Sequence, residues 1–215
     1  IVTGYASKNM ASGLFLAKRD QLSMEKQDNG FIPINLARYV IDEEGKSVSS
    51  SIFGLMKRKA IYKEGLGAIL VNDGYDSAKK FKAPNRFKST NNLTYPYGDL
   101  PQRDTIFEEV NYEKLQMAVD KSFDAAGETK LQTRSVLVVY KDQIIAEKYE
   151  DGFDRASLMH GWSMTKSLTS TMYGILTREG RIDINETTGL EAWAEDDRKH
   201  ITYNDLLHMN SGLAW

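Results

Sequence analysis

A serine and a lysine three residues apart form the most reactive pattern in this sequence. Ser163 and Lys166 stand in the stretch Gly161-Trp-Ser-Met-Thr-Lys-Ser167. Residues three apart on a helix lie on one face, so the two side chains can meet within one helical turn. A serine hydroxyl becomes a good nucleophile when a base removes its proton, and a neutral lysine amine can be that base. The spacing is therefore compatible with a serine nucleophile that a lysine activates.

The Ser-x-x-Lys pattern alone does not select a nucleophile, because it occurs three times in the chain. The match at 23–26 lies in a polar run that ends in a turn signal, and the match at 77–80 lies in a basic segment that runs into a proline. Only Ser163 opens a long amphipathic segment. From the residues alone, the alternative remains that Ser163 is a helix N-cap and Lys166 a solvated surface residue.

The segment after Ser163 has the pattern of an amphipathic helix from Ser163 to Glu179, ended by a left-handed Gly180. At the start of such a helix, the positive end of the helix dipole disfavours the charged ammonium form of a lysine, and burial disfavours it too. The same dipole favours a negatively charged oxyanion. The apolar positions predict one broad buried stripe, made of Met164, Leu168, Met172, Ile175 and Leu176.

Three blocks of this sequence are similar to a known family. The nucleophile stretch 162–167 resembles the corresponding motif of the serine β-lactamase and penicillin-binding-protein superfamily, in particular its class C branch with the related D-aminopeptidases and esterases. Residues 178–185 resemble the segment that follows the serine helix in that family. Residues 201–215, which include Ser211-Gly-Leu213, resemble its Ser-Gly-Leu block. The resemblance covers about residues 130–215.

This resemblance implies a serine hydrolase that forms an acyl-enzyme with an amide, ester or β-lactam substrate and needs no cofactor. Ser163 would be the nucleophile and Lys166 the base, while Trp162 would line the pocket or pack in the core. The substrate would be a small molecule or a peptide. The alternative is a non-catalytic sensor or binding protein with the penicillin-binding fold, which would keep its acyl group. A third reading is a fold fragment without activity.

Two further elements of the family are missing after Ser163. No Tyr-x-Asn occurs there, and neither does a Lys-Thr-Gly or His-x-Gly strand. We therefore expect the catalytic domain to be incomplete in this chain, with the rest supplied by a second chain or a further segment.

The composition argues against two other classes of protein, nucleic-acid-binding proteins and metalloproteins. The chain has 215 residues, 41% of them hydrophobic, and a net charge of −2, which gives no reason to expect a nucleic-acid partner. It has no cysteine, and its three histidines show no zinc-ligand spacing, so we expect no metal site.

Residues 1–30 resemble the start of some exported family members, which predicts an extracytoplasmic protein. The alternative is a cytosolic strand and loop.

The elements predict an α+β fold in which helices flank an antiparallel sheet, as in β-lactamases and transpeptidases. We expect residues 1–104 to form an N-terminal extension, with a β-rich part over 31–73 and a linker over 74–104. Residues 105–215 would be the first part of the hydrolase domain. The predicted elements are strands at 47–55, 59–62 and 65–71, a helix at 112–126 capped by Asn111, a hairpin of 135–140 with 144–149, and a helix at 203–209 capped by Thr202 and Asp205.

Overall fold

The computed structural model describes residues 1–72, 74–75, 82–85, 92–98, 100–102, 104–128 and 130–214. Predictions that fall elsewhere lie outside the described residues, among them the serine–lysine match at 77–80, parts of the linker and Trp215. The chain divides into two compact units, Ile1–Leu158 and Met159–Trp215. The predicted boundary near residue 104 falls within the first unit and remains a prediction.

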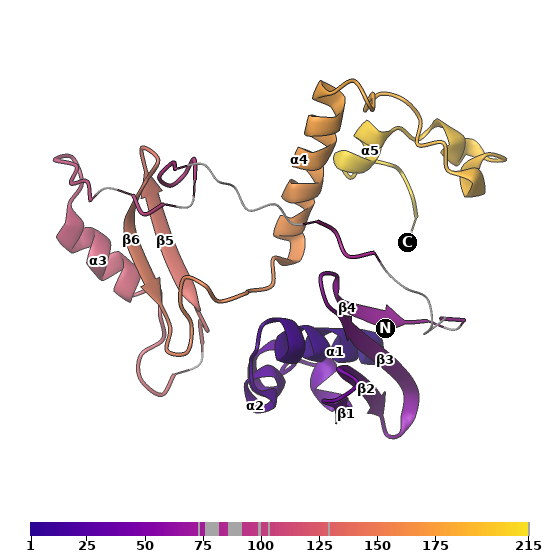
Figure 1. Ribbon diagram of the computed structural model, residues 1–215, viewed down its shortest axis with the longest axis horizontal. Helices are drawn as coiled ribbons and strands as arrows, with labels where there is room; N and C mark the ends of the chain where they lie inside the picture. The colour runs from indigo at the N-terminus through magenta and orange to yellow at the C-terminus, as the bar shows by residue number, and fades with distance from the viewer. Residues whose placement is uncertain are drawn as a thin grey trace. The chain divides into compact units, whose positions relative to one another are not determined.

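Helices and antiparallel strands together make an α+β fold, which confirms the predicted class (Figure 1). The first unit contains α1 (Val2–Ala11), η1 (Ser12–Leu16), α2 (Gln21–Ser23), η2 (Met24–Asp28), η3 (Ile34–Leu36), β1 (Arg38–Asp42), β2 (Ser47–Ile52), β3 (Leu55–Lys63), β4 (Gly67–Val71), α3 (Tyr112–Asp120), β5 (Ser135–Tyr140) and β6 (Gln143–Tyr149). The second contains η4 (Trp162–Met164), α4 (Thr165–Arg178), η5 (Glu191–Trp193), η6 (Asp197–His200) and α5 (Tyr203–Leu207). None of the helices described is long and apolar enough to cross a lipid bilayer.

The N-terminal residues form a helix, which corrects the strand and loop considered for 1–30. Thr3, Ala6, Ser7 and Met10 are buried, and their spacing of three and four residues is helical. They are small except for Met10, so α1 can lie close against β2, β3 and β4. Gly13 follows α1, and a Cβ there would stand 2.3 Å from the Met24 sulfur. A side chain at this position would displace a core residue.

The β-rich part is a four-stranded antiparallel sheet in the order β1-β2-β3-β4. The strand predicted over 47–55 is present from Ser47 to Ile52, but its extension to 55 is wrong, because Phe53 and Gly54 both have positive φ and make a two-residue turn between β2 and β3. β3 then runs from Leu55 to Lys63 and includes the strand predicted over 59–62. One phenylalanine–glycine pair among alternating residues gave too weak a turn signal to divide the run.

The core of the N-terminal residues lies between α1, η1 and the sheet. Its buried side chains come from both layers and include Met10, Phe15, Met24, Val48 and Ala60. Partly buried Tyr39, Ile41 and Tyr62 extend it along the strands. Sequestering this apolar surface from water is the main force that joins helix and sheet.

The predicted helix and hairpin that precede the serine stretch are present. Asn111 caps α3 by accepting a hydrogen bond from the Lys114 amide, but the helix ends at Asp120 rather than 126, in a turn where the Phe123 amide reaches the carbonyl of Asp120. β5 and β6 pair around Lys141 and Asp142, which both have positive φ. This is the two-residue hairpin turn whose twist suits antiparallel strands.

Candidate active site

Ser163 and Lys166 meet as their spacing predicts. The Lys166 ammonium donates a hydrogen bond to the Ser163 hydroxyl, with 3.1 Å between Nζ and Oγ. At this distance a neutral amine could accept the hydroxyl proton without rearrangement. The Ser163 side chain makes no capping bond at the helix start, so the N-cap alternative has no support here.

The helix begins slightly later than predicted. Ser163 lies in the 3-10 turn η4, and the α-helix α4 starts at Thr165. The turn leads directly into α4, so the serine stands at the amino end of a helix, where the dipole is positive. Lys166 is in the first turn of α4, which places its amine next to that end.

Trp162 has a backbone conformation that the sequence did not indicate. Its φ is +43°, in the left-handed region that bulky residues rarely adopt. The conformation costs on the order of 1 kcal/mol, and such strain clusters at functional sites. The side chain is 63% exposed, and its ring meets that of His160 edge to face, with 6.5 Å between centroids. Trp162 therefore stands beside the serine with its ring open to solvent, rather than in a core.

The apolar stripe predicted on the serine helix is not buried in this structure. Met164, Leu168, Met172 and Ile175 are 71%, 66%, 59% and 42% exposed, and no residue of α4 is buried. A stripe is buried only where another element packs on it. In the second unit such packing includes a ring contact of Tyr173 with Tyr203 of α5, with 5.6 Å between centroids. Ser163 and Lys166 are also exposed.

The end of α4 has the predicted geometry. Gly180 has a φ of +67° and donates its amide to the carbonyl of Thr177, while the Arg181 amide reaches the carbonyl of Leu176. These two bonds make a Schellman motif, which a glycine in the left-handed conformation permits. The chain therefore changes direction at the start of residues 178–185, the second of the three blocks that resemble the family.

The second and third blocks are hydrogen-bonded to each other. The amide of Asn204 donates to the carbonyl of Ile184. The pairing continues just after the second block, at residues 187–188, where the amide of Thr188 donates to the carbonyl of Ile201. Thr187 and Thr202 form an antiparallel bridge between them. Ile201 is 8% exposed and is the buried residue at this junction. The two blocks therefore fold as one substructure after the serine helix.

The helix α5 carries the predicted capping box. Thr202 accepts the amide of Asp205, and the Asp205 carboxylate accepts the amide and hydroxyl of Thr202. The backbone and side-chain hydrogen bonds from Thr202 lower the pKa of Asp205 below its usual value. The helix ends at Leu207, two residues before the predicted Met209.

A metal centre is absent from the part of the chain that the structure describes: no three His, Cys, Asp or Glu side chains there lie close enough to hold an ion. The three histidines are separate in the sequence, at 160, 200 and 208.

Comparison with known proteins identifies the segment that carries this site. Residues 119–215 match the family model described as Beta-lactamase. The matched range begins within α3 and includes the hairpin, the serine helix and the two blocks that follow. No curated protein and no solved structure matches the chain. Residues 119–215 are therefore similar to the Beta-lactamase family, a match consistent with the serine β-lactamase and penicillin-binding-protein superfamily.

Proposed function

We propose that this chain carries the nucleophile of a serine hydrolase, with Ser163 as the acylated residue and Lys166 as its base. The Beta-lactamase family match suggests a hydrolase of the serine superfamily. The observation that carries the finer proposal is the 3.1 Å contact between Lys166 Nζ and Ser163 Oγ, inside the matched segment. The substrate would be an amide, an ester or a β-lactam.

The reaction that this pair supports has two stages. In the first, neutral Lys166 takes the hydroxyl proton while Oγ bonds to the substrate carbonyl carbon, and the carbonyl oxygen becomes an oxyanion. The oxyanion then collapses, the bond to the leaving group breaks, and the leaving group takes the proton from Lys166, which becomes neutral again. In the second stage, water attacks the acyl-serine and releases the acid, which restores Ser163.

The serine hydroxyl is suited to this role by its place in the chain. It stands at the amino end of α4, where the helix dipole stabilises negative charge on the adjacent oxyanion. The neighbouring Trp162, with its ring 63% exposed, would contact the part of the substrate nearest the scissile bond. A flat aromatic face would favour apolar or planar groups there.

The test is hydrolysis of a chromogenic ester by the polypeptide as its gene encodes it. We expect Ser163→Ala to lower kcat/KM about 10⁴-fold or more, as removal of a nucleophile does. Lys166→Arg should cost nearly as much, because a guanidinium stays protonated and cannot accept the serine proton. The matched control is Ser167→Ala, which removes a neighbouring hydroxyl and should retain activity. Full activity in Ser163→Ala would refute the proposal.

The sensor alternative differs in its second stage. A sensor would form the acyl-serine and keep it, while a hydrolase would release it to water. A burst of product without steady turnover in the same assay would favour the sensor, and steady turnover would favour the hydrolase.

A further inference from the structure

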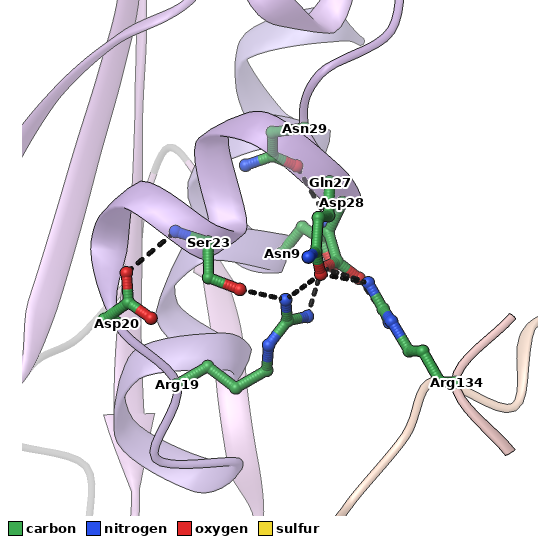
Figure 2. A network of polar contacts seen from close by, with 8 residues as sticks. All are labelled: Asn9, Arg19, Asp20, Ser23, Gln27, Asp28, Asn29 and Arg134. Carbon is green, nitrogen blue, oxygen red and sulfur yellow. Dashed lines mark hydrogen bonds and ion pairs between the residues drawn. The ribbon is translucent and has the colours of Figure 1, made fainter. Parts of the chain in front are cut away.

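A buried carboxylate joins two distant parts of the first unit. Asp28 ends η2, and its side chain is only 7% exposed. It forms an ion pair with Arg19 from the same region and accepts two hydrogen bonds from Arg134, at 3.1 and 2.7 Å (Figure 2). Arg134 comes from the segment that matches the Beta-lactamase family, whereas Asp28 lies outside it. The contact thus connects the N-terminal residues with the family segment.

Neighbouring groups complete the network. The Gln27 side-chain oxygen accepts from both arginines, at 2.7 Å from Arg19 and 3.3 Å from Arg134. Arg19 also donates to the hydroxyl of Ser23. Figure 2 shows both arginines reaching toward Asp28, Arg19 from the same region and Arg134 from a separate part of the chain. When two guanidinium nitrogens of one arginine donate to the two oxygens of a carboxylate, the ion pair is strong and has a fixed orientation.

An aromatic ring lies against both arginines. The guanidinium carbons of Arg19 and Arg134 stand 5.4 and 5.2 Å from the centroid of the Phe153 ring, within the range of cation–π attraction. Phe153 follows β6, and Arg134 precedes β5, so both come from the open end of the hairpin. The Glu150 amide donates to the carbonyl of Arg134, which ties the two ends together.

The contact depends on polar groups rather than on close packing. A cavity of about 400 Å³ lies on one side, lined by residues that include Lys18, Ser23 and Leu158. A second cavity of about 330 Å³ is lined by residues that include Lys26, Asp124 and Glu150. Phe153 and Gln27 border both cavities. Open space thus adjoins the contact, and the interactions that join the two parts here are the ion pairs, hydrogen bonds and cation–π contacts of the arginines.

We infer that Asp28 is a docking anchor through which residues 1–72 hold the open end of the β5–β6 hairpin by way of Arg134 and Phe153. The N-terminal residues are then a bound partner of the family segment rather than a separate extension. Asp28, Arg134 and Phe153 are positioning residues, since they hold the hairpin end. Removing Arg134 leaves Asp28 paired with Arg19 alone, and removing the Asp28 charge leaves both guanidinium groups without their carboxylate.

Amide hydrogen exchange on the full chain tests this inference. In Arg134→Gln, we expect exchange to rise about tenfold or more in two separate regions, residues 20–28 and the hairpin ends at 134–137 and 148–153. Asp28→Asn should raise exchange in the same regions. The double variant should exchange no faster than the faster single variant, because both substitutions remove one shared interaction.

The matched control is Arg155→Gln. Arg155 also forks onto a carboxylate, that of Glu147, but both residues lie on the hairpin side. Its loss should leave exchange at 20–28 unchanged. Arg134 is accessible enough for the variant to fold even if Asp28→Asn does not, since its side chain is 23% exposed. Exchange at 20–28 that stays within about twofold of wild type in Arg134→Gln, or rises equally in Arg155→Gln, would overturn the inference.

Discussion

At the scale of single residues, the backbone of Trp162 is the unusual feature next to the serine. Its positive φ places a bulky side chain in a conformation that Cβ disfavours, directly before Ser163. The strain sets the direction from which the chain enters the helix that carries the nucleophile. Such a cost persists when the surrounding structure determines the conformation.

This conformation predicts an inverted order of stability for two substitutions. Trp162→Gly should be more stable than Trp162→Ala by about 1 kcal/mol, because glycine adopts a positive φ without a Cβ penalty. At an ordinary position alanine would be the more stable of the two. Both variants lose the same ring, so the comparison isolates the backbone. Urea unfolding of the two proteins measures the difference, and a more stable alanine variant would rule out the left-handed conformation.

At the scale of elements, the sequence predicted what depends on local pattern. The serine helix, its Gly180 end, the Asn111 cap and the Thr202 capping box each follow from residues within one or two turns. The hairpin of β5 and β6 was also predictable, because two apolar runs flank a short polar turn. These signals are local, and the structure confirms them.

Elements set by distant contacts were harder to predict. The helix α1 has a buried face of mostly small residues, which give little hydrophobic contrast in sequence. The apolar stripe of α4 was predicted correctly as a pattern but wrongly as buried, because pattern alone does not supply the packing partner. The Asp28–Arg134 pair spans 106 positions, and no periodicity relates residues that far apart. The left-handed Trp162 likewise has no sequence signal, since a bulky residue rarely adopts a positive φ.

At the scale of the whole molecule, the docking anchor makes the first unit sensitive to acid. Burial raises the pKa of Asp28, but hydrogen bonds from Arg134 and Arg19 outweigh it and hold the pKa below the usual 3.8. The charged groups that face Asp28 are these two arginines. Tyr5 lies near enough that burial, and then the Asp28 charge, raise its pKa.

The sign of the effect follows from the lowered pKa. A folded pKa below the unfolded value means that ionised Asp28 stabilises the folded state, fully above about pH 4 to 5 and less as pH falls through the folded pKa. We expect the free energy of unfolding of wild type to fall more steeply than that of Asp28→Asn between about pH 5 and pH 2. Urea unfolding of both proteins at several pH values measures this. Parallel curves would show that Asp28 contributes nothing through its charge.

Labelling with a fluorescent phosphonate tests the central claim most directly, because the reagent bonds covalently to an activated serine hydroxyl. The polypeptide as its gene encodes it should carry the label on the peptide that contains Ser163, identified by mass. Ser163→Ala should remain unlabelled, Lys166→Arg should label far more slowly, and Ser167→Ala should label as wild type does. Equal labelling of wild type and Ser163→Ala, or an adduct on another serine, would contradict the assignment of Ser163 as the nucleophile.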